Sequence, residues 1–561
     1  MPLTDTNISI SRTERVFPST PPTTERCISL SLLDATTANF SLTNALWLFE
    51  RPTLRPPTNL SLAHHLRQCL EITLTSYPQW TGQCKAIHAL DGSADNEAQN
   101  LPPHARRFGR LYAHFGTGEY PGVELITATS SVTLDSLHPV TRTATTPLWN
   151  RHEASLDAFS PGTAMASPLG QNNPDDTSGL RKPLLAIQLT ELACGGFIVA
   201  AQIVHPMADI AALVHFVKSW GSVSRSRLRN EALPMMDPVF DPARLDDLAA
   251  GDINAGEPDE VILGRDRALP MHRFDWWIPV EGRPPPSIPA AFGVDIPPPS
   301  GSAMPWADWD VKAPVLSYVV HLSRQQVEIL WQAASRDQPK ELRISKHDAV
   351  LAHIWSCITR ARGLEGDDSI PVHCDLTVGV RPAMQLGNAF IGSPIVIVNI
   401  EMPGAQVAAR DPGLQPTARR IRETVVKIST RESLAAHLHG LAFEKSPQRI
   451  WQAFLGQRHI LVTTWARAGI YEVDFGFHGE LAPCVRYADG VVPDMDGIVL
   501  IKEAPLMSFS AVSDSKSTWT DNGVDISVHL RAEDMERLLK DSALLPLCNT
   551  CEASTLQLNP S

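Results

Sequence analysis

Apolar residues in the first half of the chain recur with spacings that predict both helices and strands. Four leucines spaced four residues apart mark one face of an amphipathic helix: Leu62, Leu66, Leu70 and Leu74. Two continuous apolar runs, 184–191 and 197–204, lie on either side of a short segment ending in Gly195-Gly196. This arrangement predicts a β-hairpin.

A second helix is expected directly after the hairpin, with Asp209 as its N-cap. The apolar residues behind this cap have helical spacing: Ile210, Leu213, Val214 and Val217. The second half of the chain shows the same mixture of elements. Residues 348–361 predict a long buried helix, and residues 394–401 and 498–502 predict strands. The pattern therefore indicates an α/β protein.

Two irregular segments interrupt these elements. Residues 154–180 are rich in small and polar residues and predict a surface insertion. Residues 224–312 contain a proline-rich run, 283–301, whose fixed φ angles and missing N–H donors exclude a central strand or a long helix. We therefore predict an N-terminal domain over 1–223, a crossover linker over 224–312 and a C-terminal domain over 313–561.

The amino-acid composition disfavours several classes of binding partner. The 561 residues include 48 Lys or Arg and 61 Asp or Glu, which gives a formal net charge of −13. Nucleic acids and anionic membranes require an excess of basic residues, so neither is expected as a partner. The N-terminal segment has no apolar core of the kind a secretory signal needs, and the nine cysteines suit a reducing compartment. We expect a soluble, cytoplasmic protein.

Familiar catalytic signatures are absent from the sequence. It contains no Gly-Lys dipeptide, which excludes a Walker-type phosphate loop, and no G-x-S-x-G, H-E-x-x-H or G-x-G-x-x-G motif. Asp474-Phe475-Gly476 imitates a kinase motif, but the other kinase signatures are missing. These absences disfavour nucleotide-dependent and common hydrolytic chemistry.

One constellation remains, His205 followed four residues later by Asp209. Among 19 histidines about one such pair is expected by chance, so the spacing alone favours a core histidine beside a helix cap. Its position carries more weight, because His205 stands where an apolar strand stops and a helix begins. There a side chain can project into a cleft while rigid elements hold it. An imidazole with a pKa of about 6.5 can take a proton from a hydroxyl or an amine at neutral pH.

The hairpin and this motif together, LLAIQLTELACGGFIVAAQIVHPMAD over 184–209, resemble the signature of the BAHD acyltransferases. These enzymes transfer an acyl group from coenzyme A to an alcohol or an amine. VDFGFHGE at 473–480 is similar to the second family motif, D-F-G-W-G. Further resemblances follow in order along both halves, at 28–35, 62–83, 347–364 and Thr463-Thr464-Trp465. The sequence is most similar to fungal members that modify secondary metabolites, such as trichothecene acetyltransferases.

Two positions depart from the family pattern. Ile210 replaces the glycine that usually follows the aspartate, and Phe477-His478 replaces the Trp-Gly that ends the second motif. The first change affects packing behind His205, and the second affects a loop that is expected to be structural. Both bear on efficiency and substrate more than on the class of reaction.

The resemblance implies a two-domain fold of the chloramphenicol acetyltransferase-like type, with mixed sheets, flanking helices and a long crossover linker. It implies that His205 is the general base and that the Thr463 hydroxyl and the Trp465 indole N–H stabilise the oxyanion. Asp209 is expected to orient the site rather than relay charge. We expect Arg381 to pair with Asp209, or else with Asp474, whose loop with Gly476 is expected to be structural.

The resemblance also implies the partners. Acyl-CoA, with acetyl as the expected group, would be a co-substrate and not a permanently bound cofactor. The acceptor would be a small molecule, and the enzyme would be a monomer. We expect no metal site, because the pair His437 and His439 indicates a solvated helix and the Cys548–Cys551 pair has no second pair to complete a zinc site.

Three alternatives stay open at the level of sequence. An enzyme of the same fold can take its acyl group from a carrier protein, as peptide-synthetase condensation domains do, but those usually carry a second histidine where this chain has Val204. A relative can catalyse condensation or cyclisation without acyl transfer. A binding protein can keep the fold without activity, which an intact His205 argues against.

Overall fold

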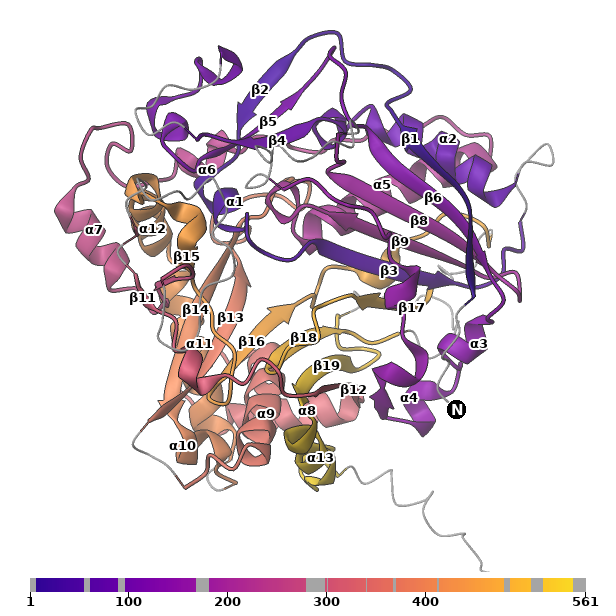
Figure 1. Ribbon diagram of the computed structural model, residues 1–561. Helices are drawn as coiled ribbons and strands as arrows, with labels where there is room; N and C mark the ends of the chain where they lie inside the picture. The colour runs from indigo at the N-terminus through magenta and orange to yellow at the C-terminus, as the bar shows by residue number, and fades with distance from the viewer. Residues whose placement is uncertain are drawn as a thin grey trace, which may run out of the picture.

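The computed structural model describes most of the chain. The described residues are 7–54, 61–88, 96–167, 181–278, 298–299, 301–339, 341–366, 370–410, 413–478, 485–505 and 518–547. Two large mixed sheets lie one above the other in Figure 1, each with helices packed against it. The mixed-sheet α/β architecture expected from the sequence is confirmed.

The upper sheet is built mainly from the N-terminal half of the chain. Its strands run in the order β1 (Ile8–Val16), β6 (Val123–Ser130), β8 (Leu185–Leu192), β9 (Phe197–Ile203), β3 (Thr43–Phe49) and β17 (Val485–Gly490). β3 and β9 are buried at every position, as central strands covered on both faces should be. The helices α2 (Leu62–Leu74) and α5 (Ile210–Leu228) pack on each other and share one hydrophobic core with this sheet.

The lower sheet belongs mainly to the C-terminal half. Its order is β14 (Ile395–Pro403), β13 (Pro371–Gly379), β16 (His459–Thr464), β18 (Ile498–Glu503), β19 (Val524–Arg531), β12 (Val315–Leu322) and β7 (Leu148–Asn150). Helix α9 (Lys346–Ala361) is buried along almost its whole length among the helices α8 (Arg324–Ser335), α10 (Gly404–Ala408), α11 (Gln415–Ile428) and α13 (Ala532–Lys540). In Figure 1, α8, α9, α10 and α13 are labelled below the sheet, and α11 is labelled beside β13 and β14, the second of which it contacts.

Shorter elements complete the described part of the fold. One small sheet has the order β2 (Arg26–Ser29), β5 (Leu111–Phe115) and β4 (Gln83–Ala86), and another has β11 (Ser302–Ala303), β10 (Phe274–Asp275) and β15 (Ile450–Trp451). The other helices are α1 (Leu32–Thr36), α3 (Leu134–Leu137), α4 (Arg142–Thr145), α6 (Ala243–Asp246), α7 (Glu260–Arg267) and α12 (Arg431–Phe443). Among the described residues, no helix has both the length and the apolar character needed to cross a membrane.

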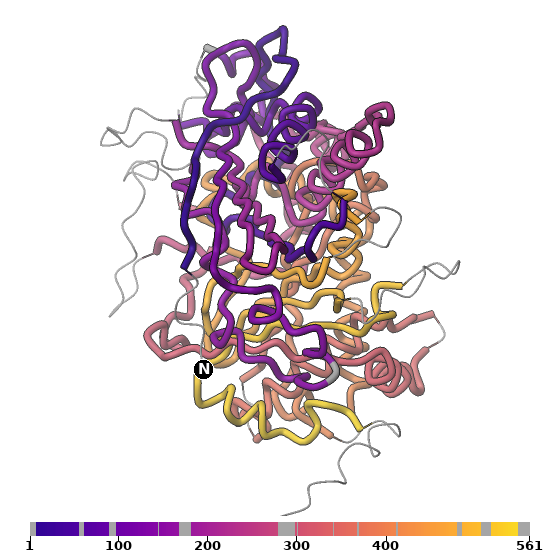
Figure 2. The backbone as a smooth tube through the Cα atoms, turned by 90° about the vertical axis from the view of Figure 1, so that its right-hand side faces the viewer, coloured from indigo at the N-terminus to yellow at the C-terminus, as the bar shows by residue number. Residues whose placement is uncertain are grey.

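The two halves exchange strands. β7 leaves the N-terminal half and pairs antiparallel with β12, whereas β17 leaves the C-terminal half and pairs antiparallel with β3. In Figure 2 the purple segment that contains β7 runs down beside the lower part of the molecule. The boundaries predicted at 223 and 313 do not account for these two strands, because neither has a sequence pattern that shows which sheet it joins.

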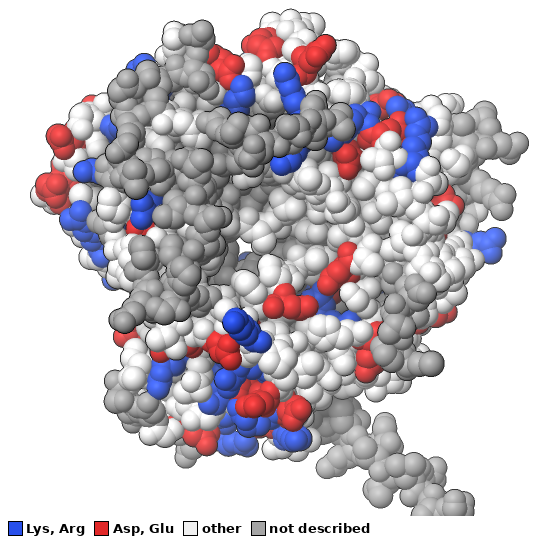
Figure 3. Space-filling view, viewed as in Figure 1, with Lys and Arg blue, Asp and Glu red and all other residues white. Residues whose placement is uncertain are grey.

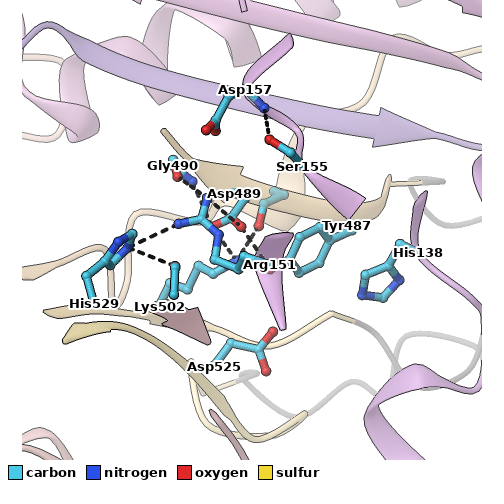
Figure 4. A network of polar contacts seen from close by, with 12 residues as sticks. His138, Arg151, Ser155, Asp157, Tyr487, Asp489, Gly490, Lys502, Asp525 and His529 are labelled. Atoms are coloured by element: carbon cyan, nitrogen blue, oxygen red, sulfur yellow. Dashed lines mark hydrogen bonds and ion pairs between the residues drawn. The ribbon is translucent and has the colours of Figure 1, made fainter. Parts of the chain in front are cut away.

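A buried polar network ties the exchanged strands together (Figure 4). Arg151, just after β7, places Nη2 3.1 Å from the Gly490 carbonyl oxygen and 3.4 Å from Asp489 Oδ2, both on β17. Lys502 of β18 reaches the same carboxylate, with Nζ 3.0 Å from Asp489 Oδ1, and donates to Tyr487 Oη at 2.9 Å. Breaking a buried pair of this kind costs about 3–5 kcal/mol, so the network opposes separation of the sheets.

The linker contains more regular structure than its prolines suggest. Helix α5 continues through the predicted boundary to Leu228, and α6, α7, β10 and β11 all lie within 224–312. The proline-rich run 283–301 lies almost entirely outside the described residues, whereas 154–167 of the predicted insertion 154–180 is described and contains the short 3₁₀ turn Asp157–Phe159. Beyond the end of α5, the described part of this segment thus holds short helices and two-residue strands, and the linker boundaries stay a prediction.

Candidate active site

His205 lies where the central strand β9 gives way to helix α5. Pro206 supplies no N–H for the β ladder, so the strand ends at Ile203 and a 3₁₀ turn, His205–Met207, follows. Asp209 then caps the helix, its Oδ1 accepting from the Ala212 N–H at 3.0 Å. The imidazole is therefore fixed between a buried strand and a helix cap, as the sequence predicted.

The carboxylate of Asp209 pairs with Arg381, one of the two partners expected for this arginine. Arg381 follows β13 and donates through both Nη atoms, with Nη2 2.9 Å from Asp209 Oδ1 and Nη1 on Oδ2. Nη2 also reaches the carbonyl oxygens of Phe390 and Gly392 at 3.1 and 3.3 Å. Both charged side chains are buried. Bidentate geometry of this kind makes a strong, directional pair.

The imidazole itself contacts Ser393. His205 Nδ1 lies 2.9 Å from Ser393 Oγ, and the Ser393 N–H donates to Asp34 Oδ1 at 2.6 Å. Asp34 in turn forms a capping box with Ser31 at the start of α1. Gly392, at φ +144°, allows this approach, because a Cβ there would lie 3.0 Å from Asp34 Oδ1. Among the described residues His205 Nε2 has no hydrogen-bond partner.

Burial sets the protonation state of this group. It lowers the pKa of His205 to about 4, and the nearby Asp209 carboxylate offsets part of the effect. The imidazole is therefore neutral at pH 7. If Nδ1 carries the proton toward Ser393, the lone pair of Nε2 is free to accept another. Burial also raises the pKa of Asp34 to about 6, against the effect of its hydrogen bonds.

An aromatic wall stands beside His205. The Phe40 ring meets the imidazole edge to face at a centroid distance of 5.2 Å and meets Trp451 at 4.9 Å. A small cavity of about 10 Å³ lies on this side, lined by Thr36, Phe40, Leu441, Pro447, Ile450 and Gln452. Figure 3 shows the molecule hollowed near its centre, where the two halves meet.

Thr463 and Trp465 lie at the end of β16, on the C-terminal side of the junction. Thr463 is half-buried and forms a register pair with Leu500 of β18. Trp465 is buried, and its ring packs so closely on Gly490 of β17 that a Cβ there would lie 2.5 Å from Cη2. Trp465 therefore contributes to the hydrophobic core through its packing on Gly490, independently of any hydrogen bond that its indole N–H makes.

Asp474 and Gly476 form a loop against the back of α5. Asp474 Oδ1 accepts from the Gly476 N–H at 2.7 Å, and its Oδ2 lies 3.6 Å from Arg225 of the helix. Gly476 has φ +81°, and a Cβ there would lie 2.6 Å from Arg225 Cγ. The Asp474–Gly476 loop thus packs against α5, the helix that begins at the His205–Asp209 motif.

The solvated-helix interpretation of His437 and His439 is wrong. Both side chains are buried, because the linker helix α7 packs on α12. His437 Nδ1 lies 2.9 Å from Asp266 Oδ1, and His439 Nδ1 lies 2.8 Å from the Ala250 carbonyl oxygen. Cys548 and Cys551 lie outside the described residues.

Sequence reasoning missed two members of this site, Asp34 and Ser393. A signal for Asp34 was present, because Ser31-Leu-Leu-Asp34 has the spacing of a capping box. No comparable signal marks Ser393, which sits in an irregular loop whose partners come from distant parts of the chain.

Comparison with known proteins bears on this geometry. The sequence model of the transferase family matches residues 121–262 and 299–545, more than half of the chain. The chain belongs to this family, that of the BAHD acyltransferases.

Relatives of this acyltransferase share nearly its whole length. Acyltransferase AFT15-1 of Alternaria alternata is 26% identical over 96% of this chain and 97% of its own. Acyltransferase abl6 of Leptosphaeria maculans is 23% identical over 96% and 98%. The structure of F. graminearum TRI101 complexed with coenzyme A and deoxynivalenol has a TM-score of 0.63 at 17% identity, covering 92% of this chain and 98% of that one. The fold expected from the sequence is thus confirmed.

We predict that Asp209→Ala destabilises this acyltransferase far more than Asp474→Ala. Removing Asp209 leaves the buried Arg381 guanidinium without its counter-charge and should cost about 3–5 kcal/mol. The Asp474–Arg225 pair is partly exposed, so its loss should cost about 1 kcal/mol. Urea midpoints and Tm values of the two variants measure the difference. Equal losses would show that the Asp209–Arg381 pair contributes no more than a surface contact.

Proposed function

We propose that the enzyme transfers an acyl group from acyl-CoA to a hydroxyl, or an amine, of a small molecule, with His205 as general base. One observation carries the proposal: His205 is held through Nδ1 on Ser393, while its Nε2 has no partner among the described residues. A neutral, oriented imidazole with one nitrogen free is what proton abstraction requires.

The proposed reaction conserves protons and bonds. Nε2 takes the proton of the acceptor hydroxyl as its oxygen attacks the thioester carbonyl carbon, forming a C–O bond and a tetrahedral oxyanion. The oxyanion collapses, the C–S bond breaks, and the imidazolium returns the proton to the departing thiolate. General-base assistance of this kind contributes about 10²–10⁴-fold to the rate.

Ser393 and Arg381 have positioning roles in this proposal. Ser393 accepts from Nδ1 and selects the tautomer in which Nε2 is basic. Arg381 binds both oxygens of the Asp209 carboxylate, so this carboxylate does not form a hydrogen bond with the imidazole. Thr463 and Trp465 are proposed as oxyanion donors. Their support is the resemblance of Thr463-Thr464-Trp465 to the family and their place at the end of β16.

The choice of acyl-CoA as donor is supported by family membership and by the TRI101 structure, which holds coenzyme A and deoxynivalenol. We propose acetyl as the acyl group. A carrier-protein donor remains the second possibility, but the position where condensation domains usually have an additional histidine is the buried Val204.

The acceptor is proposed to lie against the Phe40–Trp451 wall. Phe40 contacts His205 and Trp451 packs on Phe40, and the cavity that Phe40 lines is largely apolar. The cavity of about 10 Å³ has room for about one water molecule, so an acceptor with a flat apolar body and a hydroxyl directed at His205 Nε2 would have to widen it on binding.

Calorimetric titration with coenzyme A and a panel of acyl-CoAs tests the donor. We expect saturable binding, with a preference for short chains. His205→Gln should bind the same acyl-CoA within a few-fold but lose transfer by about 10²–10⁴-fold, since only proton transfer is removed. A folded wild-type protein that binds no acyl-CoA would contradict this donor, and a fully active His205→Gln would contradict the base.

Substitution of Trp465 and Thr463 tests the oxyanion donors. Trp465→Phe preserves most of the packing on Gly490 but removes the indole N–H, and Thr463→Val removes a hydroxyl at constant shape. Loss of one oxyanion donor lowers kcat by about 10²–10³-fold. A variant whose kcat is unchanged identifies a residue that only packs.

The reactivity of His205 toward diethyl pyrocarbonate reports its pKa without any substrate. With a pKa of about 4, the imidazole is almost wholly neutral from pH 8 down to pH 5.5, so its carbethoxylation rate should stay nearly constant. An ordinary histidine would lose about tenfold over that range. Peptide mass spectrometry follows the reaction at His205, with N-acetylhistidine as the reference. A tenfold fall at His205 would contradict the lowered pKa.

A further inference from the structure

Three histidines from three separate segments converge away from His205. His272 belongs to the linker just before β10, His373 lies near the start of β13, and His459 begins β16. One ring nitrogen from each lies within 4.8 Å of those of the other two. His373 and His459 are register partners on adjacent parallel strands, and their rings stack at 4.3 Å.

A buried carboxylate lies beside two of these rings, outside the group of three mutually close nitrogens. Asp375 lies two residues after His373 and therefore on the same face of β13, and it is completely buried. Its Oδ1 lies 3.3 Å from His272 Nε2, and its Oδ2 lies 3.3 Å from His459 Nδ1. Oδ2 also accepts from the Phe454 N–H at 2.9 Å.

These groups satisfy one another only in part, because the contact of His459 Nδ1 with Asp375 Oδ2 is a hydrogen bond but two other atoms stay unpaired. His272 Nε2 and Asp375 Oδ1 are both buried, and neither has a hydrogen-bond partner among the described residues despite their proximity. No Lys or Arg of the described chain forms an ion pair with Asp375. A buried carboxylate without a counter-cation is costly, and a divalent ion would supply the missing charge.

A neighbouring side chain also holds the His373 ring in an orientation that suits metal binding. His373 Nδ1 lies 3.0 Å from Asn399 Oδ1 on β14. An Nδ1–H donated to this amide oxygen leaves the lone pair of Nε2 available. Metal-binding histidines characteristically make such a second hydrogen bond, which fixes the tautomer and the ring plane.

The cluster differs from the other buried His–Asp contacts of the described chain. His321 with Asp525, His437 with Asp266 and His104 with Asp246 each place a single ring against a carboxylate. Only at Asp375 do several imidazoles meet one carboxylate. A hydrogen bond needs one ring, whereas a metal ion needs several ligands.

We propose that His272, His373, His459 and Asp375 bind a zinc ion. Three imidazole nitrogens and one carboxylate oxygen form a tetrahedral set that zinc accepts. Zn–N distances of about 2.0–2.1 Å place tetrahedral ligand atoms about 3.4 Å apart. The three nitrogens, now within 4.8 Å of one another, and the Asp375 carboxylate would therefore move inwards when the ion binds. All four ligands come from the protein, which is typical of a structural site.

Such an ion would join the linker to two strands of the C-terminal sheet. It would take no part in acyl transfer, because His373 lies near the beginning of β13 whereas Arg381 follows the far end of that strand. The proposal therefore does not depend on the proposed reaction, and it departs from the expectation of no metal site, which stays a prediction.

Titration of the chelator-treated full-length enzyme with Zn²⁺ tests the proposal. We expect one ion per chain by calorimetry and by elemental analysis after dialysis, together with a rise in Tm. Co²⁺ in place of Zn²⁺ should give the visible absorption of a tetrahedral nitrogen–oxygen site without a thiolate band. If the folded wild-type enzyme binds no Zn²⁺, that result alone overturns the proposal.

Three variants locate the ion. His373→Asn keeps a polar group near Asn399 but removes the Nε2 ligand, and it should abolish both binding and the rise in Tm. Asn399→Ala should weaken binding by about 10–100-fold. The double variant Cys548→Ser/Cys551→Ser should bind as the wild type does. Zn²⁺ retained by His373→Asn but lost from the double cysteine variant would place the ion on those cysteines and overturn the proposal.

Discussion

The ion pair between Asp209 and Arg381 fixes the place of His205 relative to the second half of the chain. Asp209 stands at the N-terminus of α5, where a helix favours negative charge, and its carboxylate also receives a buried guanidinium. The buried Arg381 charge depends on this carboxylate, because without it the guanidinium would face the positive end of a helix. The pair therefore holds the cap of α5 and the segment after β13 in one geometry. Ser393 directly follows Gly392, whose carbonyl group Arg381 binds together with that of Phe390, so the same contacts place Ser393 where it reaches the imidazole.

Strand exchange makes this geometry hard to disturb. A cleft between two independent domains would widen and narrow as the domains move, but β7 and β17 each belong to one half by sequence and to the other by pairing. The buried network of Arg151, Asp489 and Lys502 adds charged contacts at the exchange, and these contacts lose their partners if the sheets separate. The site is thus built on rigid elements from both sides, as a reaction that needs sub-ångström placement of a base requires.

The sequence predicted those helices and strands whose own residues show a clear hydrophobic or capping pattern. The leucine spacing of α2, the apolar runs of β8 and β9 and the cap of α5 follow from local periodicity, and the order of the motifs indicated the family. The sequence also limited the partner of Arg381 to two carboxylates. What it did not show depends on contacts between distant segments. β7 is three half-buried residues long, Ser393 lies in a loop, and His437 and His439 became buried because an unexpected linker helix covers them.

The linker has a role in the site that its composition does not suggest. Its Trp276 meets Trp451, which packs on the Phe40 ring beside His205, and on its other side Trp276 meets Trp306. Trp306 packs on Phe454, whose ring meets His459 of the histidine cluster. An unbroken series of aromatic contacts therefore connects that cluster with the wall beside the proposed base. Packed rings have few alternative arrangements, so the position of the linker sets the shape of this wall. If the acceptor lies against this wall as proposed, changes in this segment would alter the acceptor that fits and leave the geometry of His205, Asp209 and Arg381 as it is.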